Sequence, residues 1–244
     1  MSFNGHTQMR GEVLQPLDEI DGFWVRPGFF NSNGAVSNGR GVSFTIHSTG
    51  ATSCTLLLFR PHETEPYASL RFPDSYRIGN TYSMYVFDLK IDEFEYAYQM
   101  DGPYDPERGL LFDQKNVLLD PYAHAVTGQH KWGEKTIGGE KLVYHGRVVE
   151  NNFDWGKPKQ LELAAEDLII YELHVRGFTK DDSSGVTAGG TYQGLKEKIP
   201  YLKNLGVNAV ELMPIFEFDE LESERFMDGE RLYNYWGYNT VCFF

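Results

Sequence analysis

The sequence predicts a chain in two parts, an antiparallel β-sandwich followed by the opening βα units of a parallel α/β fold. Two observations carry this prediction: short segments of alternating apolar and polar residues before residue 101, and longer apolar runs separated by a helical repeat after Asn152. With 244 residues, of which 41% are hydrophobic and 23% charged, the chain has enough material for one large or two modest globular domains.

The sandwich is predicted from four strand-like segments separated by Gly, Pro, Asn and Asp turns. Residues 42–46 alternate apolar and polar side chains, and residues 94–100 alternate aromatic with polar ones. Residues 54–60, which stop at Pro61, and residues 81–88 supply two more apolar runs. Several short strands of this kind are typical of a small antiparallel sandwich.

A connector of residues 101–126 follows the sandwich. It lacks a regular period but contains Val117, Leu118 and Leu119, which a flexible linker would not have. Pro fixes φ and Asp can bond the following backbone, so three turns are predicted, at Asp101-Gly102-Pro103, Asp105-Pro106 and Asp120-Pro121. We expect the connector to pack as an ordered arm.

The second part begins with residues 168–175, a nearly continuous apolar run that predicts a strand buried on both faces. Apolar residues then recur at helical spacing, and Pro200 predicts a kink or a new start within that helix. Gly206 ends the helix, and residues 207–213 form a second apolar strand that stops at Pro214. Strand, helix and strand with short joints predict a βα unit with a right-handed crossover.

The loop after the second strand, residues 216–238, is long and rich in Asp, Glu and Tyr. In α/β barrels, the loops at the C-terminal ends of the strands build the active site. A complete barrel needs about 250 residues, whereas roughly eighty follow Glu166. We therefore expect only the start of a barrel, cut inside the domain, because residues 241–244 form an apolar, strand-like end.

Charge and segment composition argue against several classes of function. The 22 Lys and Arg against 35 Asp and Glu give a net charge of −13, which disfavours a nucleic-acid partner. No apolar run approaches the ~18 residues of a membrane span, and residues 1–20 lack the pattern of a secretory signal, so we expect a cytoplasmic protein. Cys54 and Cys242 lie in apolar runs and are predicted to be buried thiols.

Three segments of the second part carry a family resemblance: residues 171–179 (Tyr-Glu-Leu-His-Val-Arg-Gly-Phe-Thr), residues 206–214, and residues 234–239 (Asn-Tyr-Trp-Gly-Tyr-Asn). In this order they resemble the first strand, the second strand and the approach to the third strand of the barrel in the α-amylase superfamily, glycoside hydrolase family thirteen. The Arg-Gly-Phe-Thr ending is similar to the isoamylase and glycogen-debranching branch. Residues 101–109 and 119–123 resemble the starch-binding-type module and connector of the same enzymes.

This resemblance implies a multidomain β plus α/β fold. Its parts would be an immunoglobulin-like β-sandwich of carbohydrate-binding type with its connector over residues 11–125, a linking segment over residues 126–165, and the truncated start of a (β/α)8 TIM barrel over residues 166–244. The implied enzyme is a glycogen debranching hydrolase that cleaves α-1,6 branch linkages with retention through two carboxylates. In the family these carboxylates sit on later strands, so no catalytic residue is assigned and the chain alone is expected to be inactive.

Within the chain, the resemblance implies substrate-binding roles for Tyr238 and Trp236. Tyr238 matches a family tyrosine that stacks on glucose at the cleavage subsite, and Trp236 occupies a neighbouring position. An aromatic face can cover the apolar C–H side of a pyranose, and Gly237 lets the backbone approach closely. The alternative is that these rings, with Tyr233 and Tyr235, only pack the loop. The expected partner is glycogen or a branched α-glucan, with no cofactor, metal, nucleic acid or membrane.

Other residues admit a functional and a structural interpretation. Glu172 and Glu211 lie mid-strand as a candidate acid–base pair, but we expect a structural role with hydrogen bonds from neighbours such as His174. The glycine-rich residues 185–190 lack the ending of a phosphate-binding loop. Three tryptophans could be glucan platforms, although we expect them to be buried between the two domains: Trp24, Trp132 and Trp155.

Two alternative functions stay open at this point. The chain could be a stand-alone glucan-binding module, with its function in the sandwich. It could also belong to a glucan branching or transglycosylating enzyme of the same superfamily. Arg176 and the connector residues 101–108 argue against the second alternative, through the resemblance alone.

Overall fold

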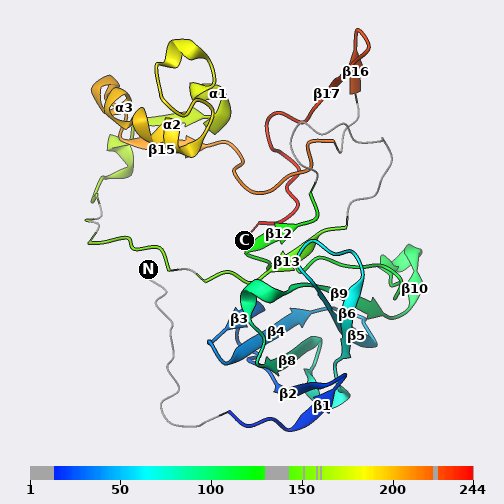
Figure 1. Cartoon of the computed structure of the whole chain (residues 1–244). Helices are drawn as coiled ribbons and strands as arrows, with labels where there is room; N and C mark the ends of the chain where they lie inside the picture. The colour runs from blue at the N-terminus through cyan, green and yellow to red at the C-terminus, as the bar shows by residue number, and fades with distance from the viewer. Residues whose placement is uncertain are drawn as a thin grey trace. The chain divides into compact units, whose positions relative to one another are not determined.

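The computed structural model describes residues 14–129, 143–150, 152–157, 159, 161–221 and 225–243. The chain divides into two compact units, Met1–Glu150 and Asn151–Phe244, each of which is described by itself (Figure 1). The predicted linking segment, residues 126–165, spans the division between these units, and part of it, including Trp132, lies outside the described residues. The predicted domain boundaries stay predictions.

The first unit is a sandwich of two antiparallel sheets, which confirms the predicted β-sandwich. The first sheet has the order β1-β2-β8-β4-β3, with β7 paired to β8. Its strands are β1 (Asp18–Ile20), β2 (Phe23–Pro27), β3 (Gly34–Ser37), β4 (Gly41–His47), β7 (Arg77–Ile78) and β8 (Thr81–Phe87).

The second sheet has the order β12-β13-β9-β5-β6. Its strands are β5 (Ser53–Phe59), β6 (Pro66–Arg71), β9 (Glu95–Asp101), β12 (Ala125–Thr127) and β13 (His145–Arg147), and two short 3-10 helices accompany the sandwich, η1 (Asp74–Tyr76) and η2 (Ile91–Glu93). All four predicted strands are present as β4, β5, β8 and β9, and each lies next to another of the four in a sheet. The strands that sequence reasoning missed are mostly the shorter ones at the sheet edges.

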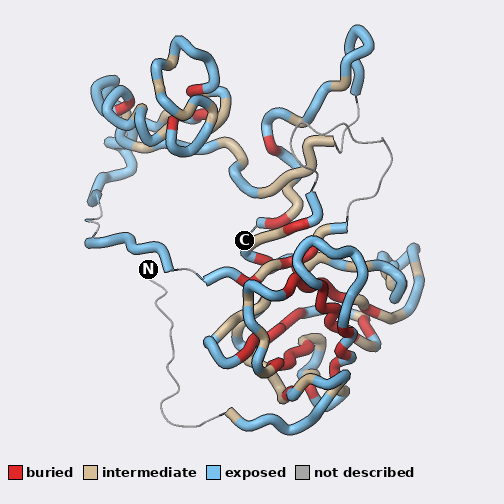
Figure 2. Tube along the Cα trace, viewed as in Figure 1, coloured by how far each residue is buried: buried red, intermediate tan, exposed pale blue. Residues whose placement is uncertain are grey.

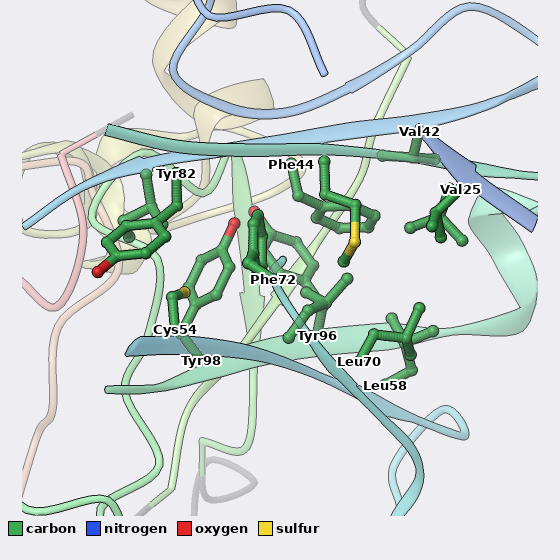
Figure 3. Packing of buried hydrophobic residues seen from close by; sticks show 14 of the residues in the cluster. Val25, Val42, Phe44, Cys54, Leu58, Leu70, Phe72, Tyr82, Tyr96 and Tyr98 are labelled. Carbon is green, nitrogen blue, oxygen red and sulfur yellow. The ribbon is translucent and has the colours of Figure 1, made fainter. Parts of the chain in front are cut away.

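Side chains from both sheets fill the space between them (Figure 3). Phe44 of β4 is fully buried and lies edge-on to Tyr96 of β9, with ring centroids 5.2 Å apart. Cys54 lies in the same core, where burial raises the pKa of its thiol. Cys242 of the second unit is also buried, so the prediction of two buried thiols is confirmed.

The connector packs as an ordered arm, as predicted. Tyr98 and Leu118 exchange two backbone hydrogen bonds of 2.9 and 2.8 Å, which place the arm beside β9. Asp120 is fully buried, and its carboxylate accepts hydrogen bonds from the Tyr96 hydroxyl and the Tyr122 N–H, both at 2.9 Å. The arm also contains the β10–β11 hairpin, built from β10 (Tyr104–Asp105), η3 (Pro106–Arg108) and β11 (Leu110–Leu111).

A buried polar contact holds β13 on the second sheet. Glu95 of β9 is 1% exposed, and its carboxylate lies 3.2 Å from Nδ1 of His145, which is also buried. The imidazole of His145 stacks on Phe59 of β5, with ring centroids 3.8 Å apart. The backbone pairing of β13 with β9 has one register pair, Gly146 opposite Tyr96. The side-chain contacts of His145 therefore supplement this short pairing.

The second unit contains a parallel pair of strands, β14 (Ile170–Leu173) and β15 (Ala209–Leu212). Between them the chain forms α1 (Val175–Thr179), η5 (Asp182–Ser184), α2 (Tyr192–Glu197) and α3 (Ile199–Leu205); η4 (Ala165–Asp167) precedes β14 and a hairpin of β16 (Arg225–Met227) and β17 (Glu230–Leu232) follows β15. Lys198 separates α2 from α3, which begins at Ile199 with Pro200 in its first turn, and Gly206 ends α3 with φ of 92°, as predicted for both Pro200 and Gly206.

The expectation that residues 168–175 form a strand buried on both faces is wrong for this structure. Ile170 is 56% exposed, and Val210, which pairs with the neighbouring Tyr171, is 42% exposed. Figure 2 shows that buried residues gather in the sandwich and are sparse around β14 and β15. The physical reason is that two paired strands with three short helices leave most of their apolar surface without a covering layer.

Candidate functional site

The predicted site residues Trp236 and Tyr238 lie in the long segment that follows β15. This segment folds back on itself: Phe218 and Thr240 form an antiparallel bridge, and the Val241 N–H donates to the Glu217 carbonyl at 2.8 Å. These contacts hold residues 234–241 beside residues 214–218, directly after the C-terminal end of β15. The site therefore lies at the strand end where parallel α/β folds place their functional loops.

Gly237 is required between the two aromatic residues. Its φ of 77° lies in the left-handed region, and a Cβ there would lie 3.2 Å from both the Phe218 ring and the Pro214 carbonyl oxygen. The Asn234 side chain closes the same turn, because its Nδ2 donates to the Tyr238 carbonyl at 2.7 Å. The local sequence thus fixes the backbone between Asn234 and Tyr238.

The aromatic residues of this turn divide into two kinds. Tyr235 is 47% exposed and packs on the imidazole of His174, the residue after β14, with ring centroids 4.8 Å apart. Trp236 and Tyr238 are 57% and 54% exposed, and neither ring contacts another ring or a cation in the described part of the chain. Their free faces could cover the apolar side of a sugar ring. Among the described residues, Tyr235 therefore has a ring contact within its unit that Trp236 and Tyr238 lack.

Glu172 and Glu211 do not form an acid–base site in this structure. They are register partners in the β14–β15 pair, and both are exposed. The expected hydrogen bond from His174 is wrong: Nδ1 of His174 instead accepts the Gly177 N–H at 3.0 Å and begins α1.

Sequence reasoning missed Glu217, which lies in the same segment as the aromatic residues. It is partly buried, and burial, followed by the charge of Glu220, raises the pKa of its carboxyl. The signal in the sequence was the acidic run of residues 217–220 directly after an apolar strand. Among the described residues, no group of three or more His, Cys, Asp or Glu side chains could hold a metal ion.

Two of the three tryptophans considered as glucan platforms are exposed within their own units, and their burial between the two domains stays a prediction. Trp24 is 52% exposed because it precedes the core residue Val25 on β2, and successive strand residues point to opposite faces. Trp155 is 74% exposed and contacts Phe153, with ring centroids 4.8 Å apart. Trp132 lies outside the described residues.

The first unit defines an antiparallel β-sandwich with a packed connector. Residues 32–123 match the family described as carbohydrate-binding module 48 (isoamylase N-terminal domain). This range runs from before β3 into the connector, and it therefore includes strands of both sheets but not β1, β2, β12 or β13. No helix in the described ranges is long and apolar enough to cross a membrane.

The wider chain is similar to named debranching proteins, which confirms the predicted resemblance. It is 36% identical to isoamylase 1, chloroplastic, of Arabidopsis thaliana over 95% of this chain and 30% of that protein. It is 31% identical to the glycogen debranching enzyme of Dickeya chrysanthemi over 85% of this chain and 32% of that protein. The chain thus spans about a third or less of the length of these relatives. One of them is named as chloroplastic, so the cytoplasmic location stays a prediction.

Solved structures of pullulanases share the fold. The pullulanase of Anoxybacillus sp. LM18-11 complexed with maltotetraose superposes with a TM-score of 0.63 and 27% identity, over 87% of this chain and 29% of that one. The apo pullulanase of Paenibacillus barengoltzii gives a TM-score of 0.62 over 82% of this chain and 30% of that one. At 20% identity, this second match concerns the fold alone.

Proposed function

We propose that this chain is the N-terminal part of a glycogen debranching hydrolase that cleaves α-1,6 branch linkages of glycogen or limit dextrin. The observation that carries the proposal is the pairing of a carbohydrate-binding sandwich with two exposed aromatic residues at the end of a parallel strand. Similarity to isoamylases and glycogen debranching enzymes over most of the chain supports it.

In this proposal the second unit is the beginning of a TIM barrel. The parallel pair β14–β15, with helices between its strands, supports this assignment. His174 and Pro214 follow the two strands, and the Trp236–Tyr238 turn lies beside Pro214. Loops at this end of a barrel form the active site. The chain's own role is to hold a glucose ring against Tyr238 and Trp236.

The chemistry is proposed to follow the retaining two-carboxylate mechanism. One carboxylate attacks the anomeric carbon, and a carboxylic acid protonates the leaving oxygen and later activates water. Both groups are proposed to lie on polypeptide that continues beyond Phe244. The ring of Tyr238 would orient the sugar between them, since an aromatic face fixes the plane of the pyranose.

The experiment compares the 244-residue chain with a polypeptide that continues through a complete barrel. We expect the longer protein to release linear chains from a branched glucan, and the short chain to show no turnover. In the longer protein, Tyr238→Ala should lower kcat/KM by about tenfold or more, because a positioning contact near the reacting bond is lost. Turnover by the 244-residue chain alone would contradict the placement of the catalytic carboxylates.

A stand-alone glucan-binding module is the alternative that one structural observation favours. The sandwich has its own core and forms a compact unit that ends at Glu150. Titration with maltooligosaccharides discriminates between the two: the module alternative requires saturable binding that survives deletion of everything after Asn152. A branching or transglycosylating activity would instead yield new branch points rather than free linear chains in the product analysis.

A further inference from the structure

The sandwich contains two arginines that stack on tyrosine rings, and they differ in what else they bind. In the first pair, the guanidinium carbon of Arg77 lies 4.9 Å from the ring centre of Tyr82. Tyr82 is 2% exposed, and its hydroxyl donates to the Ala51 carbonyl at 3.0 Å. Nε of Arg77 donates to the Gly79 carbonyl at 2.7 Å. Both residues of this pair bond to backbone carbonyls of the sandwich, so the pair has a structural role.

The second pair, Arg60 and Tyr67, makes no such internal bonds. The guanidinium carbon of Arg60 lies 4.5 Å from the ring centre of Tyr67, which is 37% exposed. Across the described ranges, neither the guanidinium nor the Tyr67 hydroxyl has a hydrogen-bond partner. A stacked guanidinium keeps its five N–H donors in one plane, so these donors are held in place and face solvent.

A β-bulge brings the two residues together. Leu58 pairs with Ala68 and Phe59 pairs with Pro66, so Tyr67 is the extra residue on the edge strand β6. Bulges at sheet edges re-aim a side chain. Here the ring of Tyr67 turns towards Arg60, which follows β5 directly, and towards Phe23 of β2, with ring centroids 6.4 Å apart.

The opposite sheet braces this edge. Asp21, in the turn between β1 and β2, accepts a hydrogen bond of 3.1 Å from the Ser69 N–H through Oδ2. This bond ties the β1–β2 hairpin to β6, and Phe23 begins β2 directly after the turn. Since both sheets contribute to the position of the Tyr67 ring, the Arg60–Tyr67 pair is pre-organised before any ligand arrives.

The surroundings favour a neutral, hydroxyl-rich ligand over an anion. Burial raises the pKa of Tyr67, while Arg60 lowers it and Glu93 raises it, so a carboxylate and a guanidinium both act on this ring. Glu63 and Glu65 lie exposed in the turn after Arg60, and the whole chain carries −13. Negative charge around a single arginine disfavours phosphate or sulfate, whereas sugar hydroxyls both accept and donate hydrogen bonds.

We propose that Arg60 and Tyr67 form a contact site for an α-glucan chain on the sandwich, separate in sequence from Trp236 and Tyr238. The guanidinium donates to sugar hydroxyls, and the Tyr67 and Phe23 rings present apolar surface to the C–H side of a glucose unit. The inference rests on the proposed function for its ligand class, because both residues lie inside the range matched to a carbohydrate-binding module. It deepens that function by naming where the sandwich touches the polymer.

The test measures maltoheptaose binding to the 244-residue chain by isothermal titration calorimetry. Arg60→Ala and Tyr67→Ala should each raise the Kd by roughly tenfold, which corresponds to the loss of one charge-assisted hydrogen bond or one aromatic contact. Tyr67→Phe should change the Kd by less than about threefold if the ring face carries most of the tyrosine's contribution. Tyr104→Ala is the matched control, because Tyr104 is an equally large aromatic residue that is 70% exposed elsewhere on the same unit.

Several outcomes would overturn the inference. If Tyr104→Ala abolishes binding while both site variants bind like the parent, the sandwich contacts glucan on a different face. If the unsubstituted chain does not bind maltoheptaose, the proposed Arg60–Tyr67 site is wrong. Cleavage of branched glucan by the longer polypeptide is a separate result, so the site and the proposed enzyme function can fail independently. Binding of inorganic phosphate that depends on Arg60 and excludes maltoheptaose would also refute a sugar site. Near-ultraviolet circular dichroism of each variant confirms that the sandwich stays folded.

Discussion

The two units of this chain contain apolar strands that look alike in sequence but differ in burial. In the sandwich, residues of β5 and β9 such as Leu56, Leu58 and Tyr98 have no exposed surface. In the second unit, Ile170 and Val210 come from runs that are just as apolar, yet both are substantially exposed. The sandwich supplies a second sheet to cover the first, whereas β14 and β15 have only short helices beside them. Burial is thus a property of the assembled layers rather than of the strand.

The largest difference between the two units is expected when each is produced as a separate polypeptide. Residues 14–150 alone should unfold in one cooperative transition, because their core is complete within the sandwich. Residues 167–244 alone should aggregate or stay poorly ordered, because unpaired strand edges and apolar faces remain uncovered. Urea unfolding and size-exclusion chromatography of both pieces provide the measurement. A monomeric, cooperative transition for the second piece would contradict our reading of its exposed surface.

Alanine substitutions of one buried and one exposed apolar side chain should differ in their effect on stability. Phe44→Ala should cost about 3–5 kcal/mol of unfolding free energy, because a fully buried ring between the sheets leaves a cavity. Ile170→Ala should cost within about 0.5 kcal/mol, since that side chain is already largely exposed. Hydrogen exchange of the β4 and β14 amides under increasing urea reports both effects. Equal losses at the two positions would show that β14 is buried in solution.

Asp120 tests the connection between the arm and the core. Asp120→Ala should cost about 1–3 kcal/mol, because the buried Tyr96 hydroxyl loses its acceptor. The exposed Asp92→Ala is the control and should be close to neutral. Urea unfolding at neutral pH measures both variants.

Asp120 should also make the free energy of unfolding depend on pH in the acid range. Burial raises the pKa of Asp120 above its unfolded value, so the folded state binds the proton more readily. The extra stability that comes from binding this proton is therefore complete below the ordinary aspartate pKa of about 3.9 and is lost as the pH rises through the folded pKa. Asp120→Asn should remove this fall in stability, and an unchanged pH profile would assign the slope to other carboxyls.

The smallest expected effect concerns the turn that holds Trp236 and Tyr238. Asn234→Ala removes the 2.7 Å hydrogen bond to the Tyr238 carbonyl, worth about 0.5–1.5 kcal/mol. The Val241 amide, which donates to Glu217, should then exchange several-fold faster with solvent, by roughly the factor that this free energy implies. Trp236→Ala is the control, because its exposed ring should leave that amide's protection unchanged. Equal exchange in both variants would mean that Asn234 does not fix the turn.

The parts of the fold that local chemistry dictates were predictable from the sequence. Alternation located β4 and β9, apolar runs located β5 and β8, and Pro200 and Gly206 marked the start and end of α3. The apolar run through Val175 concealed the end of β14, because the residue that ends it is His174, whose side chain caps α1 through a bond to Gly177. A cap of this kind depends on a rotamer and not on a hydrophobic pattern.

The candidate sites were predictable to different degrees. Family resemblance singled out Trp236 and Tyr238, and their exposure is consistent with that role, although no sugar contact has been observed. No sequence pattern pointed to Arg60 and Tyr67, because a one-residue register shift between β5 and β6 brings them together. Such shifts follow from pairing across strands, which a single sequence does not display.

The arm beside β9 also decides which surfaces of the sandwich could attract another chain. Beyond β5, the other side of β9 is closed by Gly146 opposite Tyr96 and by Leu118 opposite Tyr98. A polypeptide that stopped before residue 117 would leave the Tyr98 N–H and carbonyl without their partners on a strand rich in aromatic residues. Such an open ladder is a template for strand addition between molecules. The connector, by pairing Leu118 with Tyr98, therefore also protects the sandwich from self-association through β9.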